Sequence, residues 1–258
     1  MKIVVLVKEV PDTYGDRKLN LETGLAERGA SETVIDEIGE RALEVALSYA
    51  DKHADAEVVV LSMTPAGSAA TVRKALSMGA GSAVHVADEG LVGADLGLTA
   101  EVLAAALRRT GFDLVIAGNL STDGSGGVIP SMVAELLDVP AVTALNTVQI
   151  GDGTVSGERA SDGATMQVTA ELPAVISITE ALPDGRLPNF KGIMAAKKKP
   201  FETVTLQELG IEPEDAAASR SIVLALSEKP ARAAGVKLVD DGDAGEKLAE
   251  FLIQNRLV

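Results

Sequence analysis

The pattern of apolar and polar positions divides the first 140 or so residues into two kinds of segment that alternate along the chain. One kind is a short apolar run, typical of a strand that is buried on both faces. These predicted strands span residues 2–10, 57–63, 83–87 and 113–117. The other kind carries apolar residues at helical spacing, over residues 36–50, 68–78, 98–109 and 126–137. This alternation predicts a doubly wound, mostly parallel α/β sheet with helices on both faces and right-handed crossovers.

The pattern changes after Ala141, where strand-like segments follow one another with only turns between them. They span residues 142–150, 153–160, 165–170 and 174–179. We expect antiparallel additions at one edge of the sheet and one strand that returns to its core. Prolines and glycines then predict a loop over residues 181–192.

The C-terminal part has too little apolar content to fold alone. An acidic, alanine-rich linker at residues 212–219 precedes an extended stretch at 221–226 and a predicted helix at 245–254. We therefore expect residues 1–200 to form the α/β domain, and residues 201–258 to form an extended arm that packs on a partner subunit.

Composition narrows the classes of function. The net charge of −15 argues against binding nucleic acid, whose phosphates would be repelled. No cysteine is present, which excludes disulfides and thiolate metal sites. No apolar run approaches the roughly 20 residues of a membrane span, and no signal peptide is recognisable, so we expect no membrane insertion and a cytoplasmic protein. His53 and His85 are far apart in sequence, and no catalytic acid–base set is recognisable.

A glycine-rich stretch at residues 118–127 follows one predicted strand and precedes a helix. Its glycines allow a ligand to approach the backbone N–H groups, and the helix start favours a phosphate. Ser121, Thr122 and Ser125 add hydroxyl groups. The stretch is neither a Walker motif nor a dinucleotide fingerprint. On spacing alone a plain loop is at least as common, but its place after a strand of a parallel sheet favours a ligand site.

A second unusual stretch, residues 186–200 (RLPNFKGIMAAKKKP), places Leu187 and Phe190 beside a run of three lysines in an acidic chain. Apolar side chains on a loop next to fixed charge suggest a surface that contacts another protein. A solvated turn before a basic helix start is the alternative.

Together with residues 172–179 (LPAVISIT), this stretch resembles the beta subunit of electron transfer flavoproteins. Shorter, less specific likenesses occur at residues 4–12, 75–80, 114–119 and 234–237, so that the resemblance covers nearly the whole chain. It implies an adenine-nucleotide alpha-hydrolase-like fold and a heterodimer with an alpha subunit. It also implies an electron carrier that accepts electrons from acyl-CoA dehydrogenases and related flavin dehydrogenases and passes them to a membrane quinone oxidoreductase.

The resemblance further implies a structural AMP. Its contacts would fall on Leu6, Asp36, Glu37, Ile38, Gly39, Met63, Gly118, Asn119, Leu120, Ser121, Thr122, Asp123, Gly124, Ser125, Gly126, Gly127, Val128 and Ile129. Two positions depart from the family pattern. Asp36 stands where many relatives carry Asn, and it also suits a helix N-cap. Ile129 replaces a polar Thr that is common in the family.

The redox FAD would be held mainly by the alpha subunit, and this chain would cover one side of it with Thr13, Tyr14 and Ile38. Without the resemblance, Tyr14 is simply an exposed loop aromatic. Residues 181–194 correspond to the family's partner-recognition loop, with Leu187 as the anchor that enters an apolar pocket of the dehydrogenase. The predicted partner-binding residues are Arg186, Leu187, Phe190, Lys191, Ile193 and Met194.

Two alternatives stay open at this point. In a bifurcating flavoprotein a second FAD would replace AMP in this subunit. A universal-stress-type protein would bind ATP in a homodimer without flavin, although the 186–200 motif and the long tail count against it.

Overall fold

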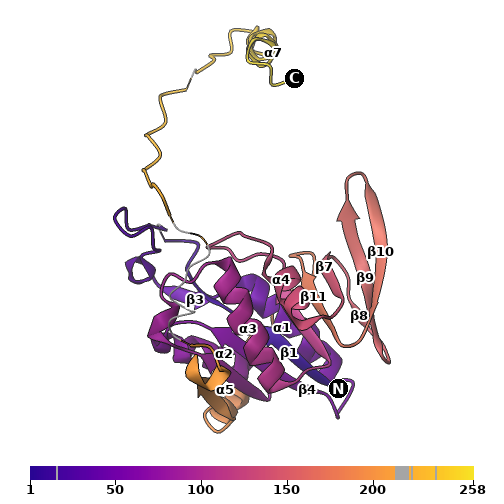
Figure 1. Cartoon of the computed structure of the whole chain (residues 1–258). Coiled ribbons are helices and arrows are strands. Elements are labelled where there is room, and N and C mark those ends of the chain that lie inside the picture. Colours follow the sequence, from indigo (N-terminus) through magenta and orange to yellow (C-terminus); the bar gives the residue numbers. More distant parts are fainter. Residues whose placement is uncertain (16, 213–220, 222, 236) are drawn as a thin grey trace. The chain divides into compact units, whose positions relative to one another are not determined.

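A computed structural model describes residues 1–15, 17–212, 221, 223–235 and 237–258. The chain divides into two compact units, Met1–Leu224 and Ala225–Val258. The first is built on a seven-stranded sheet in the order β12-β5-β4-β1-β6-β11-β7, in which every pair of neighbours is parallel (Figure 1). Its strands are β1 (Lys2–Leu6), β4 (Glu57–Met63), β5 (Ser82–Val86), β6 (Leu114–Gly118), β7 (Ala141–Leu145), β11 (Ala174–Ile178) and β12 (Phe201–Val204).

Helices cover both faces of this sheet. Residues of α1 (Glu37–Ala50) and α2 (Ala69–Met78) share one core cluster with Ile3 and Val5 of β1. Residues of α3 (Leu96–Thr110) and α4 (Ile129–Leu137) share the other cluster with Val4. Because successive side chains of a strand point to opposite faces, burial on both faces requires the continuous apolar runs seen in the sequence. The predicted doubly wound α/β fold is confirmed.

The strand order reverses direction at β1. From β1 the chain winds outward through α1, β4 and α2 to β5, and then crosses by α3 to β6, on the other side of β1. In doubly wound sheets, ligands bind at such a reversal, in the crevice outside the carboxyl ends of the two central strands. Here that position lies beyond Leu6 and Gly118.

The predicted first strand, 2–10, is in fact two strands. β1 ends at Leu6, and β2 (Glu9–Pro11) pairs instead with β3 (Thr33–Ile35) in a separate antiparallel ribbon. The residues between β2 and β3 include a short 3₁₀ helix, η1 (Arg28–Ala30).

The prediction of antiparallel additions is correct only in part. The segment expected as one strand over 142–150 divides into β7, a parallel edge strand of the main sheet, and β8 (Gln149–Ile150). β8 joins β9 (Thr154–Ser161) and β10 (Ala164–Glu171) in a separate antiparallel sheet, and the β9–β10 hairpin projects away from the core (Figure 1). The division occurs because Val142 and Leu145 are buried on the main sheet, whereas Asn146 already donates its backbone N–H to Glu158.

The predicted loop at 181–192 ends earlier than expected, because α5 (Phe190–Ala196) begins within it. The Asn189 side chain caps this helix by accepting the N–H of Gly192 at 2.8 Å. Four of the predicted partner-binding residues therefore lie on a helix and not on a loop: Phe190, Lys191, Ile193 and Met194.

β12 pairs with β5 at one edge of the main sheet, so residues just beyond the expected boundary at 200 belong to the first unit. Apart from Glu212, the predicted linker 212–219 lies outside the described residues, as does Ile222 of the predicted extended stretch. The second unit contains the predicted helix as α7 (Ala244–Gln254), with Leu248, Phe251 and Ile253 exposed. That this unit lies along a partner stays a prediction. No helix in the described ranges is long and apolar enough to cross a membrane.

Candidate functional site

The fold gathers the predicted nucleotide contacts at one edge of the main sheet. Leu6 and Gly118 end the central strands β1 and β6, and Met63 ends the neighbouring β4. Asp36 lies immediately before α1, and the glycine-rich segment joins β6 to α4. Because the central strands are parallel, their carboxyl ends lie at the same edge, and residues distant in sequence come together there.

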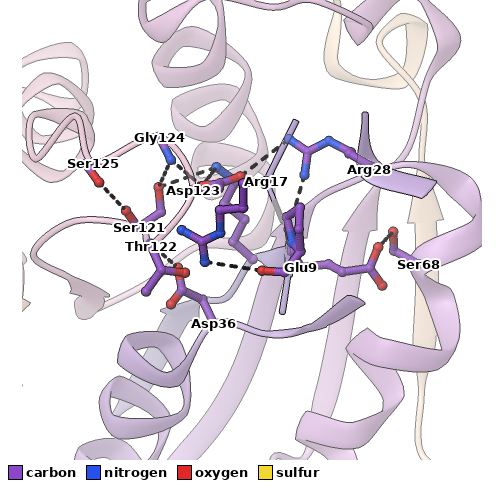
Figure 2. A network of polar contacts seen from close by, with 12 residues as sticks. Glu9, Arg17, Arg28, Asp36, Ser68, Ser121, Thr122, Asp123, Gly124 and Ser125 are labelled. Atoms are coloured by element: carbon purple, nitrogen blue, oxygen red, sulfur yellow. Dashed lines mark hydrogen bonds and ion pairs between the residues drawn. The ribbon is translucent and has the colours of Figure 1, made fainter. Parts of the chain in front are cut away.

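Asp36 connects the start of α1 to the glycine-rich segment. Its carboxylate Oδ2 accepts the backbone N–H of Thr122 at 2.9 Å (Figure 2). Asp36 occupies the N-cap position, but its side chain makes no hydrogen bond to the helix. Its backbone carbonyl does, accepting the N–H groups of Gly39 and Glu40. The residue is 2% exposed, and burial raises the pKa of its carboxyl group more than the Thr122 hydrogen bond lowers it. Within the described chain, Asp36 Oδ1 and Thr122 Oγ1 are buried without a hydrogen-bond partner.

Asp123, at the centre of the glycine-rich segment, lies between two cations. Lys8 Nζ is 2.7 Å from Oδ1, and the Arg28 guanidinium is 3.6 Å from Oδ2. Burial alone would raise the pKa of Asp123. The hydrogen bond and charge of Lys8, with hydrogen bonds from Ser121 and Gly124, together outweigh it and hold the pKa below its usual value. Sequence reasoning missed both cations. Lys8 falls inside the predicted strand 2–10, and only the observed end of β1 at Leu6 places it just after a central strand, where ligands of such sheets bind.

The segment that carries Arg28 is tied to β2 by its arginines. Arg28 donates to the carbonyl of Glu9 at 3.5 Å, and Arg17 donates to that of Pro11 at 3.2 Å (Figure 2). Glu9 is itself fixed, because its carboxylate accepts a hydrogen bond from Ser68 at 2.6 Å. These contacts hold Arg28 beside Asp123.

The glycine-rich segment approaches α4 with a left-handed backbone at Ser125 (φ 50°) and Gly127 (φ 67°). In the described part of the chain, the N–H groups of Gly126, Gly127 and Val128 donate no hydrogen bond. These residues are exposed and lie just before the helix N-terminus, where free N–H groups favour an anion.

Gly118 has a packing role in this segment. A Cβ at this position would lie 2.5 Å from Cγ2 of Ile38, so the absence of a side chain makes room for Ile38. Ile38, which was expected to contact both nucleotide and flavin, thus packs against Gly118, the first residue of the glycine-rich segment. Ile129, at the position of the missing Thr, packs against the α3–α4 core cluster.

A cavity of about 180 Å³ lies beside Asp36 and Thr122, and Thr13 and Tyr14 also line it. The structure thus brings the predicted flavin contacts next to the predicted nucleotide contacts. Tyr14 is fully exposed. Pockets that enclose small molecules usually have volumes of about 300–1,000 Å³, so a whole nucleotide would need the surrounding segments to separate.

These groups match the chemistry of a nucleotide. Free N–H groups and the cations Lys8 and Arg28 suit a phosphate. The unpartnered oxygen of Asp36 suits a hydroxyl or amino donor of a sugar or base. No cluster of His, Cys, Asp or Glu that could hold a metal ion occurs among the described residues.

The predicted partner-recognition residues lie elsewhere, on and around α5. Leu187 is 89% exposed and Phe190 is 80% exposed, and Ile193 and Met194 add further exposed apolar surface. The Arg186 side chain does not point outward with them, because it is paired with the carboxylates of Glu44 in α1 and of Asp51, the residue just after α1.

Comparison with known proteins matches residues 23–209 to the electron transfer flavoprotein domain. The chain therefore belongs to the electron transfer flavoprotein family, and an electron-transfer role follows from this membership. Within the family its similarity is to beta subunits. It is 44% identical over 263 residues to the electron transfer flavoprotein subunit beta of Mycobacterium leprae, covering 99% of both chains. The identity and coverage are the same with the subunit beta of Mycobacterium tuberculosis (strain ATCC 25618 / H37Rv).

A more distant relative is the caffeyl-CoA reductase-Etf complex subunit CarD of Acetobacterium woodii. It is 31% identical over 215 residues, which is 83% of this chain and 82% of the relative. The family assignment made from the sequence is confirmed, and it disfavours the universal-stress-type alternative.

Proposed function

We propose that this chain is the beta subunit of a heterodimeric electron transfer flavoprotein. With an alpha subunit it accepts electrons from flavin dehydrogenases of the acyl-CoA dehydrogenase type, as in fatty acid oxidation, and passes them to a membrane quinone oxidoreductase. The proposed setting is the cytoplasm. The docking part of this proposal rests on Leu187, a large apolar side chain that is almost fully exposed on a loop anchored to α1 behind it.

We propose that the crevice at the β1–β6 reversal holds a structural AMP. The N–H groups of Gly126, Gly127 and Val128, together with Lys8 and Arg28, would bind its phosphate. Asp36 Oδ1 would accept a hydrogen bond from its sugar or base. Without a nucleotide, Lys8 and Arg28 neutralise the carboxylate of Asp123. When they bind the phosphate, the same two cations would also offset the repulsion between the phosphate and this carboxylate.

The electrons would be carried by FAD, which when bound supplies the oxidation–reduction chemistry that no side chain of this protein offers. The residues of this chain would cover one side of the flavin and limit its contact with water. The exposure of Tyr14 and Thr13 at the protein surface supports such a role.

The nucleotide content of the complex tests this proposal. The chain is co-purified with its natural partner, the complex is denatured, and the released nucleotides are separated and quantified. We expect one FAD and one AMP per complex. Two FAD and no AMP would contradict the AMP assignment and favour the bifurcating alternative, whereas ATP without flavin would contradict both.

Substitution of Leu187 tests the docking part. In reduction of the complex by an acyl-CoA dehydrogenase, Leu187→Ala should raise the KM for the complex about 10- to 100-fold. This range corresponds to losing the burial of one leucine side chain, about 1.5–3 kcal/mol. Val92→Ala, an exposed apolar residue in another part of the chain, is the matched control. A KM for Leu187→Ala equal to that of the control would refute the docking role, provided that nucleotide content is unchanged.

A further inference from the structure

Arg186 immediately precedes the exposed Leu187, but its charge is directed back onto α1. Its Nε and Nη2 atoms each lie 2.8 Å from an oxygen of Glu44, in a bidentate pair. Nη2 also lies 2.9 Å from Asp51. The backbone N–H of Arg186 donates to the same Glu44 carboxylate at 3.0 Å. Both the main chain and the side chain of residue 186 are therefore attached to one helix.

This arrangement, the Arg186–Glu44–Asp51 clamp, is partly shielded from water at its centre. The side chains of Glu44 and Arg186 are 15% and 33% exposed, whereas that of Asp51 is 60% exposed. Burial raises the pKa of Glu44, but hydrogen bonds from Arg186 and Ser48 outweigh it and lower the pKa below its usual value. Glu44 thus stays ionised at neutral pH, and the bidentate geometry restricts the orientation of the guanidinium.

The loop is attached to α1 at a second place before Leu187 and to α2 after it. Arg41 of α1 contacts both the carbonyl of Leu182 and the carboxylate of Asp184. On the other side, α5 lies so close to α2 that a Cβ at Gly192 would be 2.4 Å from the carbonyl oxygen of Ser77. Leu187 is thus an exposed apolar residue on a short segment that is held at both ends.

We infer that Arg186 is a positioning residue for partner docking and does not itself contact the partner. The clamp fixes the backbone next to Leu187 before the dehydrogenase binds. Docking therefore loses less conformational entropy than it would if this backbone became ordered only on binding. This inference rests on the proposed function, because it assigns the way in which the proposed anchor is presented. It also predicts that Glu44, behind the docking surface, matters for docking as much as Arg186 does.

The test uses the complete complex and follows its reduction by a purified acyl-CoA dehydrogenase and acyl-CoA substrate. We compare Glu44→Ala, Arg186→Ala, the double variant and the reversed pair Glu44→Arg with Arg186→Glu. Each single change should raise the KM for the complex about tenfold with kcat unchanged. The double variant should resemble either single variant, since both remove the same contact, and the reversed pair should recover part of the loss.

Three outcomes would overturn the inference. If Arg186→Ala raises KM and Glu44→Ala does not, Arg186 contacts the partner directly. If the two effects multiply in the double variant, the residues act independently. If neither single variant changes KM while Leu187→Ala does, the clamp has no role although the docking function stands. An unchanged KM in Leu187→Ala would instead mean that the docking proposal itself has failed.

A second measurement needs no partner. Trypsin cleaves after arginine, and a clamped Arg186 should resist it because cleavage requires the local backbone to open. In the Glu44→Ala complex, limited digestion should cut the bond between Arg186 and Leu187 several times faster than in the unmodified complex. Glu135→Ala, an exposed glutamate on the opposite face of the sheet, is the matched control. Equal cleavage rates in all three proteins would contradict the clamp.

Discussion

Replacing Lys8 with methionine removes the closest cation from Asp123 while keeping a side chain of similar length. Breaking a buried ion pair on one side typically costs about 3–5 kcal/mol. Here the cost should be smaller. Lys8 is 41% exposed, Arg28 remains 3.6 Å from the other carboxylate oxygen, and the N–H of Gly124 still donates to Oδ1 at 2.7 Å. We therefore expect Lys8→Met to lower the free energy of unfolding by about 2 kcal/mol.

For a unit of this size, a loss of about 2 kcal/mol corresponds to a fall in Tm of roughly 4–8 °C. Thermal unfolding of the full chain, followed by circular dichroism at pH 7, measures it. Lys18→Met is the matched control, because Lys18 is exposed and its side chain makes no ion pair within the described ranges. In a second background, Asp123→Asn, the added change Lys8→Met should cost little, since the carboxylate that needs Lys8 is gone.

The pH dependence gives an independent check. The pKa of Asp123 is lowered in the folded state, so its contribution to stability is complete above its unfolded pKa of about 3.9 and is lost as pH falls through the lower folded pKa. The difference between the unmodified chain and Lys8→Met should therefore shrink below about pH 4. A fall in Tm no larger than that of Lys18→Met, or one that persists undiminished in the Asp123→Asn background, would refute this account of the ion pair.

Three further substitutions test other contacts by the same unfolding measurement. Asp36→Asn removes a buried charge but keeps an acceptor for Thr122. Because the pKa of Asp36 is raised in the folded state, the variant should be more stable than the unmodified chain by about 1 kcal/mol at pH 7. This gain in stability should diminish as pH falls through the raised pKa toward the unfolded value of about 3.9. An equal difference at every pH would contradict it. Gly118→Ala should cost about 1–3 kcal/mol by overpacking, and less in an Ile38→Ala background, whereas an equal cost in both backgrounds would be inconsistent with that contact. Lys199→Met should cost about 1 kcal/mol, because the ammonium donates to the carbonyls of Leu76 in the last turn of α2 and of Ala80 just beyond it, at 2.9 and 2.7 Å; an unchanged Tm would disprove this.

The candidate site shows how far sequence reasoning reaches. The position of the glycine-rich segment after β6 was predicted, because a strand and a helix on either side of it were recognisable from their apolar spacing. Asp36 was identified through family resemblance, but its contact was not. The N-cap interpretation described its backbone correctly and its side chain incorrectly, since the carboxylate binds Thr122, which is 86 residues away.

The cations were missed for a related reason. Lys8 falls inside the predicted strand 2–10 and Arg28 lies outside every predicted element, and only the fold brings them to Asp123. Arg186 was assigned to the partner surface because it lies in the segment 181–194, which resembles the family's partner-recognition loop. The structure places its guanidinium on Glu44, 142 residues away in the sequence.

The sequence by itself determined the class of fold, the places of most helices and strands, the family, and the exposure of apolar side chains near Leu187. All of these depend on short-range periodicity or on continuous motifs, which are readable residue by residue. Only the tertiary structure decided the strand order, the division between β7 and β8, and the polar contacts of Asp36, Asp123 and Arg186. The physical reason is that these contacts join residues 86 to 142 positions apart, and no local pattern specifies which distant partner a charged side chain will meet once the sheet has assembled.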